Sequence, residues 1–192
     1  MNSFKSYLQA IHPLSDEDFN YGVRYFKTLE LKKGDFFVQQ GKVCHKIGFV
    51  LSGTLRVFSS NETGTESTTC FCTTHKMTSS YKSFSQREPS SFSIQAIENA
   101  QLLTITYEDL EHLYATHNSW SVVGRKLLEN EFLLMEDYAV MLNRETVREN
   151  YKTLLEKAPG VLRVATLQEI ATYLGVNRRT VTRIREELLN EK

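Results

Sequence analysis

The sequence predicts an α+β chain in which a β-barrel or jelly roll is followed by a long helix and a C-terminal helix-turn-helix. Turn residues separate short alternating segments through the first half of the chain, whereas apolar residues at helical spacing dominate the second half. We expect three parts, at residues 1–118, 119–143 and 144–192.

The composition is that of a folded protein without disulfides. Hydrophobic residues make up 41% and aromatic residues 11% of the 192 positions, which is enough for packed cores. Three cysteines, an odd number, fit a reducing compartment better than a disulfide framework. The N-terminus lacks the apolar core of a signal peptide and no apolar run is long enough to span a membrane, so we expect a cytoplasmic protein.

The first 28 or so residues have a helical pattern. Pro13 interrupts it, and Ser15 followed by three acidic residues is typical of an N-cap with acids in the first turn. Phe19 and Val23, with the nearby aromatic residues, would face a core. We therefore expect helices before the barrel.

From Leu29 to about Thr106 the pattern changes to short strands between turn signals. We expect a hairpin between residues 47–51 and 54–58, and a turn at 61–64 that leads into a strand over 67–73. A later pair, at 92–97 and 101–105, alternates again. Many short strands at this spacing favour a small β-barrel or jelly roll.

A long helix should run from about Trp120 to Leu142. Its apolar stripe is wide, because Leu128, Phe132 and Met135 extend it beyond what one barrel could cover. Such a stripe favours pairing with the same helix of a second copy, and the alternative is a helix buried within its own chain. The residues near one face, which we predict to form the dimer helix contact, are Val123, Leu127, Leu134, Tyr138 and Met141.

The segment after this helix predicts a helix-turn-helix. A helix over 145–157 should stop at Ala158-Pro159-Gly160, and the pair of helices follows almost at once. In that pair, the small Ala171 allows close approach of the helices, Gly175 suits a turn with positive φ, and Asn177 is a good N-cap. Val181 and Ile184 then recur at helical spacing and would hold the second helix against the first.

The remaining face of the second helix is basic. It carries Arg178, Arg179, Arg183 and Arg185, and no acid occurs before Glu186. A helix with this face and an apolar back suits the major groove of DNA. The alternative is an ordinary helical hairpin with a solvated basic face. Because the formal net charge is +0, DNA binding needs such a local concentration: residues 144–192 hold ten Lys/Arg against seven Asp/Glu.

The order of barrel, long helix and helix-turn-helix resembles the Crp/Fnr family of bacterial transcription regulators, which have a cyclic-nucleotide-binding-like sensor domain. In the barrel the resemblance rests on Lys33-Gly34-Asp35, Gln40-Gly41, Phe49 to Gly53, Arg56-Val57 and Gly64. In the C-terminal part it rests on Glu149-Asn150-Tyr151, Leu154-Leu155 and residues 168–185. It covers nearly the whole chain.

The resemblance implies a homodimer whose paired recognition helices read a near-palindromic site, with regulation of transcription as the function and no enzymatic activity. The base-reading positions of the family fall on Arg178, Arg179 and Arg183, and the phosphate-contacting positions on Thr166, Gln168 and Thr180. We add Asn177 and Arg185 as candidate phosphate contacts. Arg179 is a departure, because many members carry Glu there; an Arg would prefer guanine or a phosphate.

The sensor pocket departs further from the family. Members that bind cyclic nucleotides hold the ribose with Gly-Glu and the cyclic phosphate with an Arg followed by Ser or Thr. Here Ser80 falls at the Glu position and Ser90 at the Arg position. Without the guanidinium, the phosphate loses charge-assisted hydrogen bonds of roughly 1.5–3 kcal/mol each, so we do not expect cAMP to bind. The pocket could take another ligand or none; its candidate residues are Ser79, Ser80, Tyr81, Lys82, Ser83, Ser90 and Ser91.

Other cofactors and functions find little support. The cysteines Cys44, Cys70 and Cys72 are too few and wrongly spaced for an iron–sulfur cluster. Cys70 and Cys72 share one face of a strand, where a metal or redox role competes with the commoner role of small buried hydrophobes. The scattered histidines give no zinc signature, and no phosphate-binding glycine loop or nucleophile elbow occurs.

Two functional readings therefore remain. The first is a DNA-binding regulator, with double-stranded DNA, a second copy and RNA polymerase as candidate partners and no membrane contact. The second is a degenerate cyclic-nucleotide-binding-like module that acts through protein–protein interaction. The chain ends seven residues after Arg185, so any wing of a winged-helix domain should be short or absent.

Overall fold

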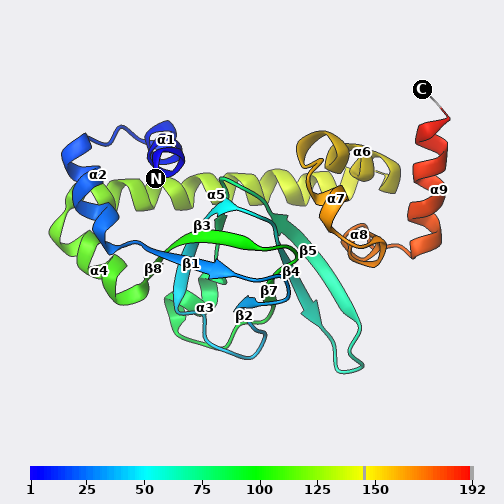
Figure 1. Ribbon diagram of the computed structural model, residues 1–192, viewed down its shortest axis with the longest axis horizontal. Coiled ribbons are helices and arrows are strands. Elements are labelled where there is room, and N and C mark those ends of the chain that lie inside the picture. The colour runs from blue at the N-terminus through cyan, green and yellow to red at the C-terminus, as the bar shows by residue number, and fades with distance from the viewer. Residues whose placement is uncertain (145, 191–192) are drawn as a thin grey trace.

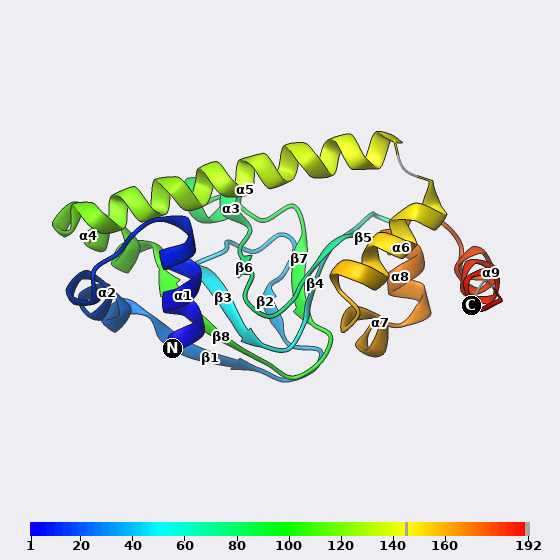
Figure 2. The ribbon, with the colours of Figure 1, turned by 90° about the horizontal axis from the view of Figure 1, so that it is seen from above.

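The computed structural model describes the backbone of residues 1–144 and 146–190. It describes the side chains of the same residues except 137–144. A β-barrel lies at the centre, the first two helices of the chain lie at one end, the C-terminal helices lie at the other, and a long helix runs alongside the barrel (Figures 1 and 2). The helices are α1 (Asn2–Ile11), α2 (Asp16–Gly22), η1 (Val23–Tyr25), α3 (Tyr81–Gln86), α4 (Tyr107–Thr116), α5 (Asn118–Arg144), α6 (Val147–Lys157), α7 (Val161–Val164), α8 (Leu167–Tyr173) and α9 (Arg178–Leu189). The strands are β1 (Lys27–Leu31), β2 (Phe36–Val38), β3 (Lys46–Ser52), β4 (Leu55–Ser60), β5 (Glu66–Cys72), β6 (Met77–Thr78), β7 (Ser93–Ala96) and β8 (Ala100–Thr106).

The barrel consists of two antiparallel sheets with strand orders β1-β8-β3-β6 and β2-β7-β4-β5. The predicted turn at 61–64 is confirmed as the β4–β5 hairpin loop, where the Asn61 amide donates to the Thr65 carbonyl at 3.1 Å and Gly64 has φ +78°. The largest core fills the space between the sheets, with Phe49, Val50, Leu55, Ile94 and Leu102 fully buried. The predicted α+β class and barrel are therefore confirmed.

The predicted hairpin between residues 47–51 and 54–58 is wrong. β3 and β4 belong to different sheets, and so do β7 and β8. The chain crosses from one sheet to the other at Gly53, which has φ +85° and lies so close to the β7–β8 turn that a Cβ would meet the Asn99 carbonyl oxygen at 2.5 Å. Alternation looks the same in both arrangements, since each places alternate residues in the core.

The N-terminal helices attach the start of α5 to the barrel. Ser15 caps α2 as predicted, since its Oγ accepts from the Asp18 amide at 3.1 Å. The Asp18 carbonyl in turn accepts from Trp120 Nε1 at 2.8 Å. Gly22 lies so close that a Cβ there would overlap the Trp120 ring. This contact fixes the N-terminal part of α5.

The dimer face predicted for α5 needs a correction. Val123 is fully buried in the core of its own chain and Leu127 contacts the same core, because α5 lies along the barrel at these positions. Leu134 is 46% exposed, whereas the side chains of Tyr138 and Met141 lie outside the described residues. The exposed apolar stripe is formed by Leu128, Phe132 and Met135, the residues that widened the predicted face.

The C-terminal helices form a second hydrophobic core from Tyr151, Leu154, Val161, Ile170, Ala171, Val181 and Ile184. Their contact with the barrel runs through α8, which lies against β5 (Figure 2). Phe71 of β5 packs into this second core beside Tyr173, with ring centroids 5.5 Å apart. Among the described residues, no helix is both long and apolar enough to cross a membrane.

Candidate nucleic-acid interface

The helix-turn-helix is built from α8, a tight turn and α9. Ile170 and Ala171 of α8 face Val181 and Ile184 of α9, and all four are buried. Gly175 has φ +67°, the left-handed conformation that lets the chain reverse after α8. The Val176 amide donates to the Ala171 carbonyl at 3.0 Å and closes this turn. The geometry agrees with the motif predicted from the sequence.

Side-chain caps fix the start of each helix. At α8, Thr166 Oγ1 accepts from the Glu169 amide at 3.2 Å, and the Glu169 carboxylate accepts from the Thr166 amide at 2.6 Å. At α9, Asn177 Oδ1 accepts from the Thr180 amide at 2.9 Å. Caps of this kind hold the orientation of both helices and so the direction of the side chains that follow.

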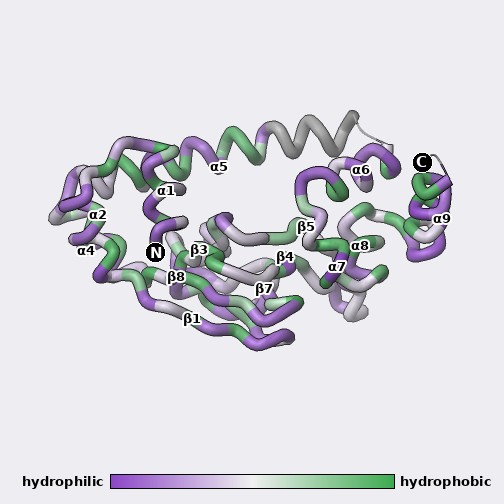
Figure 3. Tube along the Cα trace, turned by 45° about the horizontal axis from the view of Figure 1, so that its top comes forward, coloured by the Kyte–Doolittle hydropathy of each residue, from purple (hydrophilic) through white to green (hydrophobic). Residues whose placement is uncertain are grey.

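The three predicted base-reading residues lie on the outer surface of α9. Arg178, Arg179 and Arg183 are exposed, and α9 lies at the end of the molecule opposite α2 and α4 (Figure 1). α9 is mostly hydrophilic along its length (Figure 3). Arg183 contacts Glu187 at 3.6 Å in an exposed pair, a contact that water weakens and that another anion can replace.

The first turn of α9 violates a local rule of helix stability. A helix N-terminus carries partial positive charge, which favours acidic side chains, yet this turn contains no acid and two arginines. The arginines therefore add to the positive potential of the helix end instead of compensating it. Amide groups, helix dipole and guanidinium groups all favour an anion at this place.

Several predicted phosphate contacts already have intramolecular partners. Thr180 Oγ1 donates to Asn177 Oδ1 at 3.1 Å, within the cap of α9. Arg185 donates through Nε to the Tyr151 hydroxyl at 2.9 Å and braces α9 against α6. Thr166 and Gln168 are exposed at the start of α8, although Thr166 also serves as its cap. The structure thus brings these residues to one region and gives Asn177, Thr180 and Arg185 a structural role as well.

A buried arginine, Arg56 of the Arg56-Val57 barrel motif, connects the barrel to α8. Arg56 of β4 is 3% exposed, and its Nε donates to Thr68 Oγ1 at 2.8 Å. Its Nη1 lies 2.6 Å from Glu66 and 3.8 Å from Glu169 of α8. Thr68 Oγ1 also lies 2.7 Å from Thr172 Oγ1. These polar contacts join α8 to the β4–β5 hairpin, about a hundred residues earlier in the chain, and hold α8 in place on it.

The serines of the predicted ligand pocket bind one another and the backbone. Ser80 and Ser90 are buried, with their hydroxyl oxygens 2.9 Å apart, and Ser90 Oγ lies 2.6 Å from the Phe92 carbonyl. Ser83 accepts from the Cys44 amide at 2.8 Å and donates to the Glu88 carbonyl, and Ser79 donates to the Lys46 carbonyl at 3.2 Å. Tyr81 and Ser91 are exposed.

Neither basic residue near this pocket stands in for the missing guanidinium. The side chain of Lys82 is 78% exposed and reaches only towards Glu88, at 4.0 Å. Arg87 lies over the Tyr107 ring at 5.1 Å and contacts Glu108 at 3.4 Å. A short helix, α3, occupies the segment and was not predicted. The pocket is thus filled by hydroxyl–hydroxyl and hydroxyl–backbone contacts.

The two cysteines of β5 interact with each other as a pair. Hydrogen bonding to Cys72, together with burial, raises the pKa of Cys70 well above its ordinary value. The hydrogen bond from Cys70 lowers the pKa of Cys72. The described residues contain no cluster of three or more potential metal ligands.

The similarity to known proteins extends over the barrel and the C-terminal helices. Residues 28–117 match the family model of the cyclic nucleotide-binding domain. Over 189 residues the chain is 25% identical to the cyclic AMP receptor protein of Thermus thermophilus, covering 94% of this chain and 85% of that protein. It is also 25% identical over 170 residues to the transcriptional activator protein Anr of Pseudomonas protegens, covering 80% of this chain and 67% of Anr.

Solved structures share the fold. FixK2 from Bradyrhizobium japonicum superposes with a TM-score of 0.71 at 17% identity, over 86% of this chain and 85% of FixK2. A Crp/Fnr-family regulator from Eubacterium rectale superposes with a TM-score of 0.69 at 20% identity, over 97% and 88%. The barrel, long helix and helix-turn-helix stand in the same order as in these proteins, and the matches support a transcription regulator of the Crp/Fnr type.

Proposed function

We propose that this protein is a homodimeric regulator that binds a specific near-palindromic DNA sequence without needing cAMP. The observation that carries the proposal is the outer face of α9. Three exposed arginines stand on a helix that is capped at Asn177 and buried along its back by Val181 and Ile184. Such a helix can enter the major groove as a rigid unit, with its N-terminal residues against base edges.

The roles of individual residues follow from their positions. Arg178, Arg179 and Arg183 are the candidates for base contacts, and each would favour guanine O6 and N7. Gln168 and Thr166, exposed at the start of α8, are the candidates for phosphate contacts. Independence from cAMP is supported by Ser80 and Ser90, which by resemblance to the family fall at its Glu and Arg positions and whose hydroxyl oxygens lie 2.9 Å apart.

The test is selection of bound duplexes from a random pool with the full chain, followed by titration of the selected duplex at several salt concentrations. The affinity for DNA should fall steeply with salt, because each neutralised phosphate releases a counterion. Arg178→Ala and Arg183→Ala should each weaken binding to the selected site by roughly tenfold to a hundredfold and relax its sequence preference. Gln168→Ala should instead weaken binding to all sequences alike.

Arg24→Ala is the matched control, since Arg24 is also exposed but belongs to the N-terminal segment η1. Its affinity for DNA should equal that of the unaltered protein. Absence of any DNA binding by the folded dimer would favour the protein-interaction module instead. In parallel, calorimetric titration with cAMP should show no heat of binding, and saturable binding would contradict that part of the proposal.

A further inference from the structure

A cavity of about 330 Å³ lies between the barrel and the C-terminal helices, away from the serine pocket. The barrel contributes three turns to it: Gly53 and Thr54 between β3 and β4, Thr73 and Thr74 between β5 and β6, and Glu98 between β7 and β8. The other wall is the α6–α7 junction with Arg163. No local sequence pattern predicts this cavity, because its residues come from separate turns.

The polar side chains of this cavity lack partners. Among the described residues, no hydrogen bond or ion pair engages the side chains of Thr54, Thr73, Thr74, Glu98 or Arg163. The neighbouring contact between the same two parts of the chain is different, since Arg56, Thr68 and Glu169 are all paired there. Thr54 is only 5% exposed, so its hydroxyl has little access to solvent except through the cavity.

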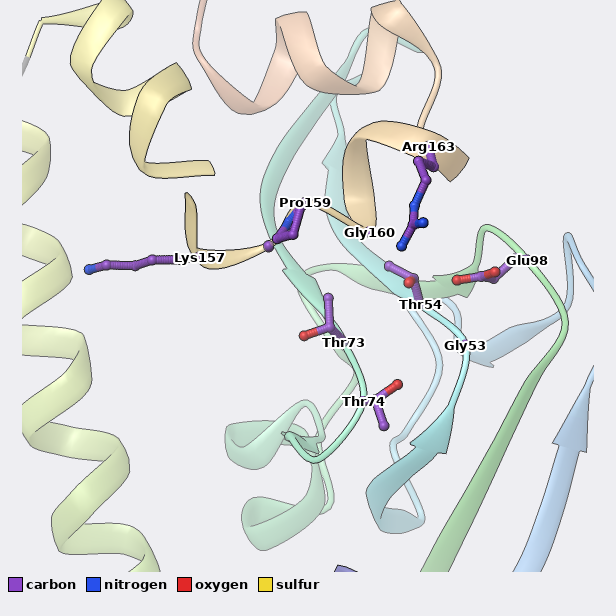
Figure 4. Close-up of a pocket in the computed structure, with 10 residues that line it drawn as sticks. Gly53, Thr54, Thr73, Thr74, Glu98, Lys157, Pro159, Gly160 and Arg163 are labelled. Atoms are coloured by element: carbon purple, nitrogen blue, oxygen red, sulfur yellow. The ribbon is translucent and has the colours of Figure 1, made fainter. Parts of the chain in front are cut away.

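Figure 4 shows how these groups are directed. Arg163 extends from α7 towards Thr54 and Gly160, and the Glu98 carboxylate lies across from it on the barrel side. Lys157 also lines the cavity, but its side chain extends away towards α5. The cavity therefore offers one guanidinium and one carboxylate that are not paired with each other, together with threonine hydroxyls.

The wall on the barrel side is preformed. Gly53 is pressed against the β7–β8 turn, and the Ile97 amide donates to the Thr54 carbonyl at 3.0 Å. Glu98 follows directly in that turn, so its position relative to Thr54 is set by the backbone. A preformed wall lowers the cost of ordering side chains when a ligand binds.

We propose that this cavity binds a small zwitterion of the amino-acid class. Its carboxylate would accept from the Arg163 guanidinium, its ammonium group would donate to Glu98, and the hydroxyls of Thr54, Thr73 and Thr74 would bind the remaining polar atoms. A simple anion is disfavoured by Glu98 and a simple cation by Arg163, whereas a zwitterion satisfies both. The volume is at the lower end of small-molecule sites, which suits a ligand of this size.

The site has a regulatory consequence that rests on the proposed DNA-binding function. Glu98 belongs to the barrel and Arg163 to the helices that carry α9, so one bound molecule would tie the two parts together. A ligand that prefers one placement of the helix-turn-helix must change the affinity for DNA, and DNA must change the affinity for the ligand by the same factor.

Binding is tested first without DNA. The full chain is titrated by calorimetry with each of the common L-amino acids, and with acetate, methylammonium and inorganic phosphate as single-charge probes. We expect saturable binding of at least one amino acid, and Glu98→Gln and Arg163→Gln should each weaken it by roughly tenfold to a hundredfold. Thr54→Val, which keeps the shape of the side chain, should weaken it by a smaller factor.

Glu62→Gln and Arg24→Gln remove the same charges from exposed positions elsewhere and should leave the affinity unchanged. Circular dichroism confirms that each variant is folded. The proposal is overturned if no amino acid binds, if the Glu98 and Arg163 variants bind as well as the original chain, or if a single-charge probe binds as tightly. If an amino acid binds as expected but the affinity for the selected duplex does not change, the regulatory link is refuted while the site stands.

Discussion

At the scale of single residues, a few charged side chains lie where their charge lowers the stability of the fold. Arg178 and Arg179 stand in the first turn of α9 against the helix dipole, and Glu131 of α5 is a carboxylate in a partly buried position. The arginines have a functional explanation, because DNA supplies the anion that the helix end lacks. Burial raises the pKa of Glu131 above its ordinary value, and Lys76 offsets part of this rise.

The raised pKa of Glu131 makes a prediction about pH. The folded chain holds this proton more tightly than the unfolded chain, so ionisation of the group destabilises the fold once the pH exceeds the unfolded pKa. Glu131→Gln should raise Tm at about pH 7 by roughly 1–3 °C, and the gain should vanish at about pH 3, well below the unfolded pKa, where both states are protonated. Thermal unfolding followed by circular dichroism across this range measures the effect.

Glu129 on the same helix is the control with the opposite sign. Hydrogen bonds from Lys126 and Arg125 lower the pKa of its carboxyl group, so its ionised form is favoured in the folded state. Glu129→Gln should therefore lower Tm slightly at neutral pH or leave it unchanged. A lower Tm for Glu131→Gln at neutral pH would contradict the assignment of burial as the dominant effect at that site.

At the scale of helices and strands, the sequence predicts where an element lies and whether it is a helix or a strand. It predicts less well which other element that helix or strand contacts. The caps at Ser15, Thr166 and Asn177 lie where local pattern predicts them, because a cap depends on residues within one turn. The pairing of β3 with β8 rather than β4 depends on contacts about fifty residues apart. The dimer face predicted for α5 was wrong at Val123 for the same reason, since Val123 and Leu134 share a stripe but only Val123 meets the barrel core.

The exposed stripe of α5 yields a prediction about assembly. Phe132 is 62% and Met135 71% exposed, and with Leu128 they follow helical spacing along one side of α5. Replacing Phe132 and Met135 together with Ser should convert the proposed dimer to a monomer at micromolar concentration, because most of the apolar contact is lost. Sedimentation equilibrium measures this change in mass.

Asn130→Ser is the matched control, since Asn130 is exposed on another face of α5. It should leave the dimer intact. The face would be wrongly assigned if the double Ser variant remained dimeric, or if the unaltered chain were a monomer throughout the concentration range. Loss of the dimer should also weaken binding to a two-half-site duplex, because one copy of α9 contacts one half-site only.

At the scale of the whole molecule, two hydrophobic cores are joined through one strand. Each core lies in a part of the chain with its own sequence pattern, and the sequence places Arg178, Arg179 and Arg183 on the outer face of α9, where the structure shows them exposed. It does not reveal Arg56, Glu98 or Arg163 as members of the surfaces where the domains meet. Those surfaces form from turns and strand faces distant in sequence, and no local spacing encodes them.

The β5–α8 contact should control whether the two domains unfold together. Phe71 reaches from β5 into the C-terminal core and lies 5.5 Å from Tyr173 between ring centroids. Phe71→Ala removes this apolar link and should weaken the C-terminal core by about 1–3 kcal/mol, because the ring is only partly buried. Amide hydrogen exchange should then show faster exchange throughout α6, α8 and α9, while β3 and β8 keep their protection.

Phe92→Ala is the matched truncation, since Phe92 is partly buried against the barrel core, and it should lower protection in the barrel instead. Equal loss of protection in both domains for either variant would mean that the molecule unfolds as one unit and that β5 is not the point where it divides.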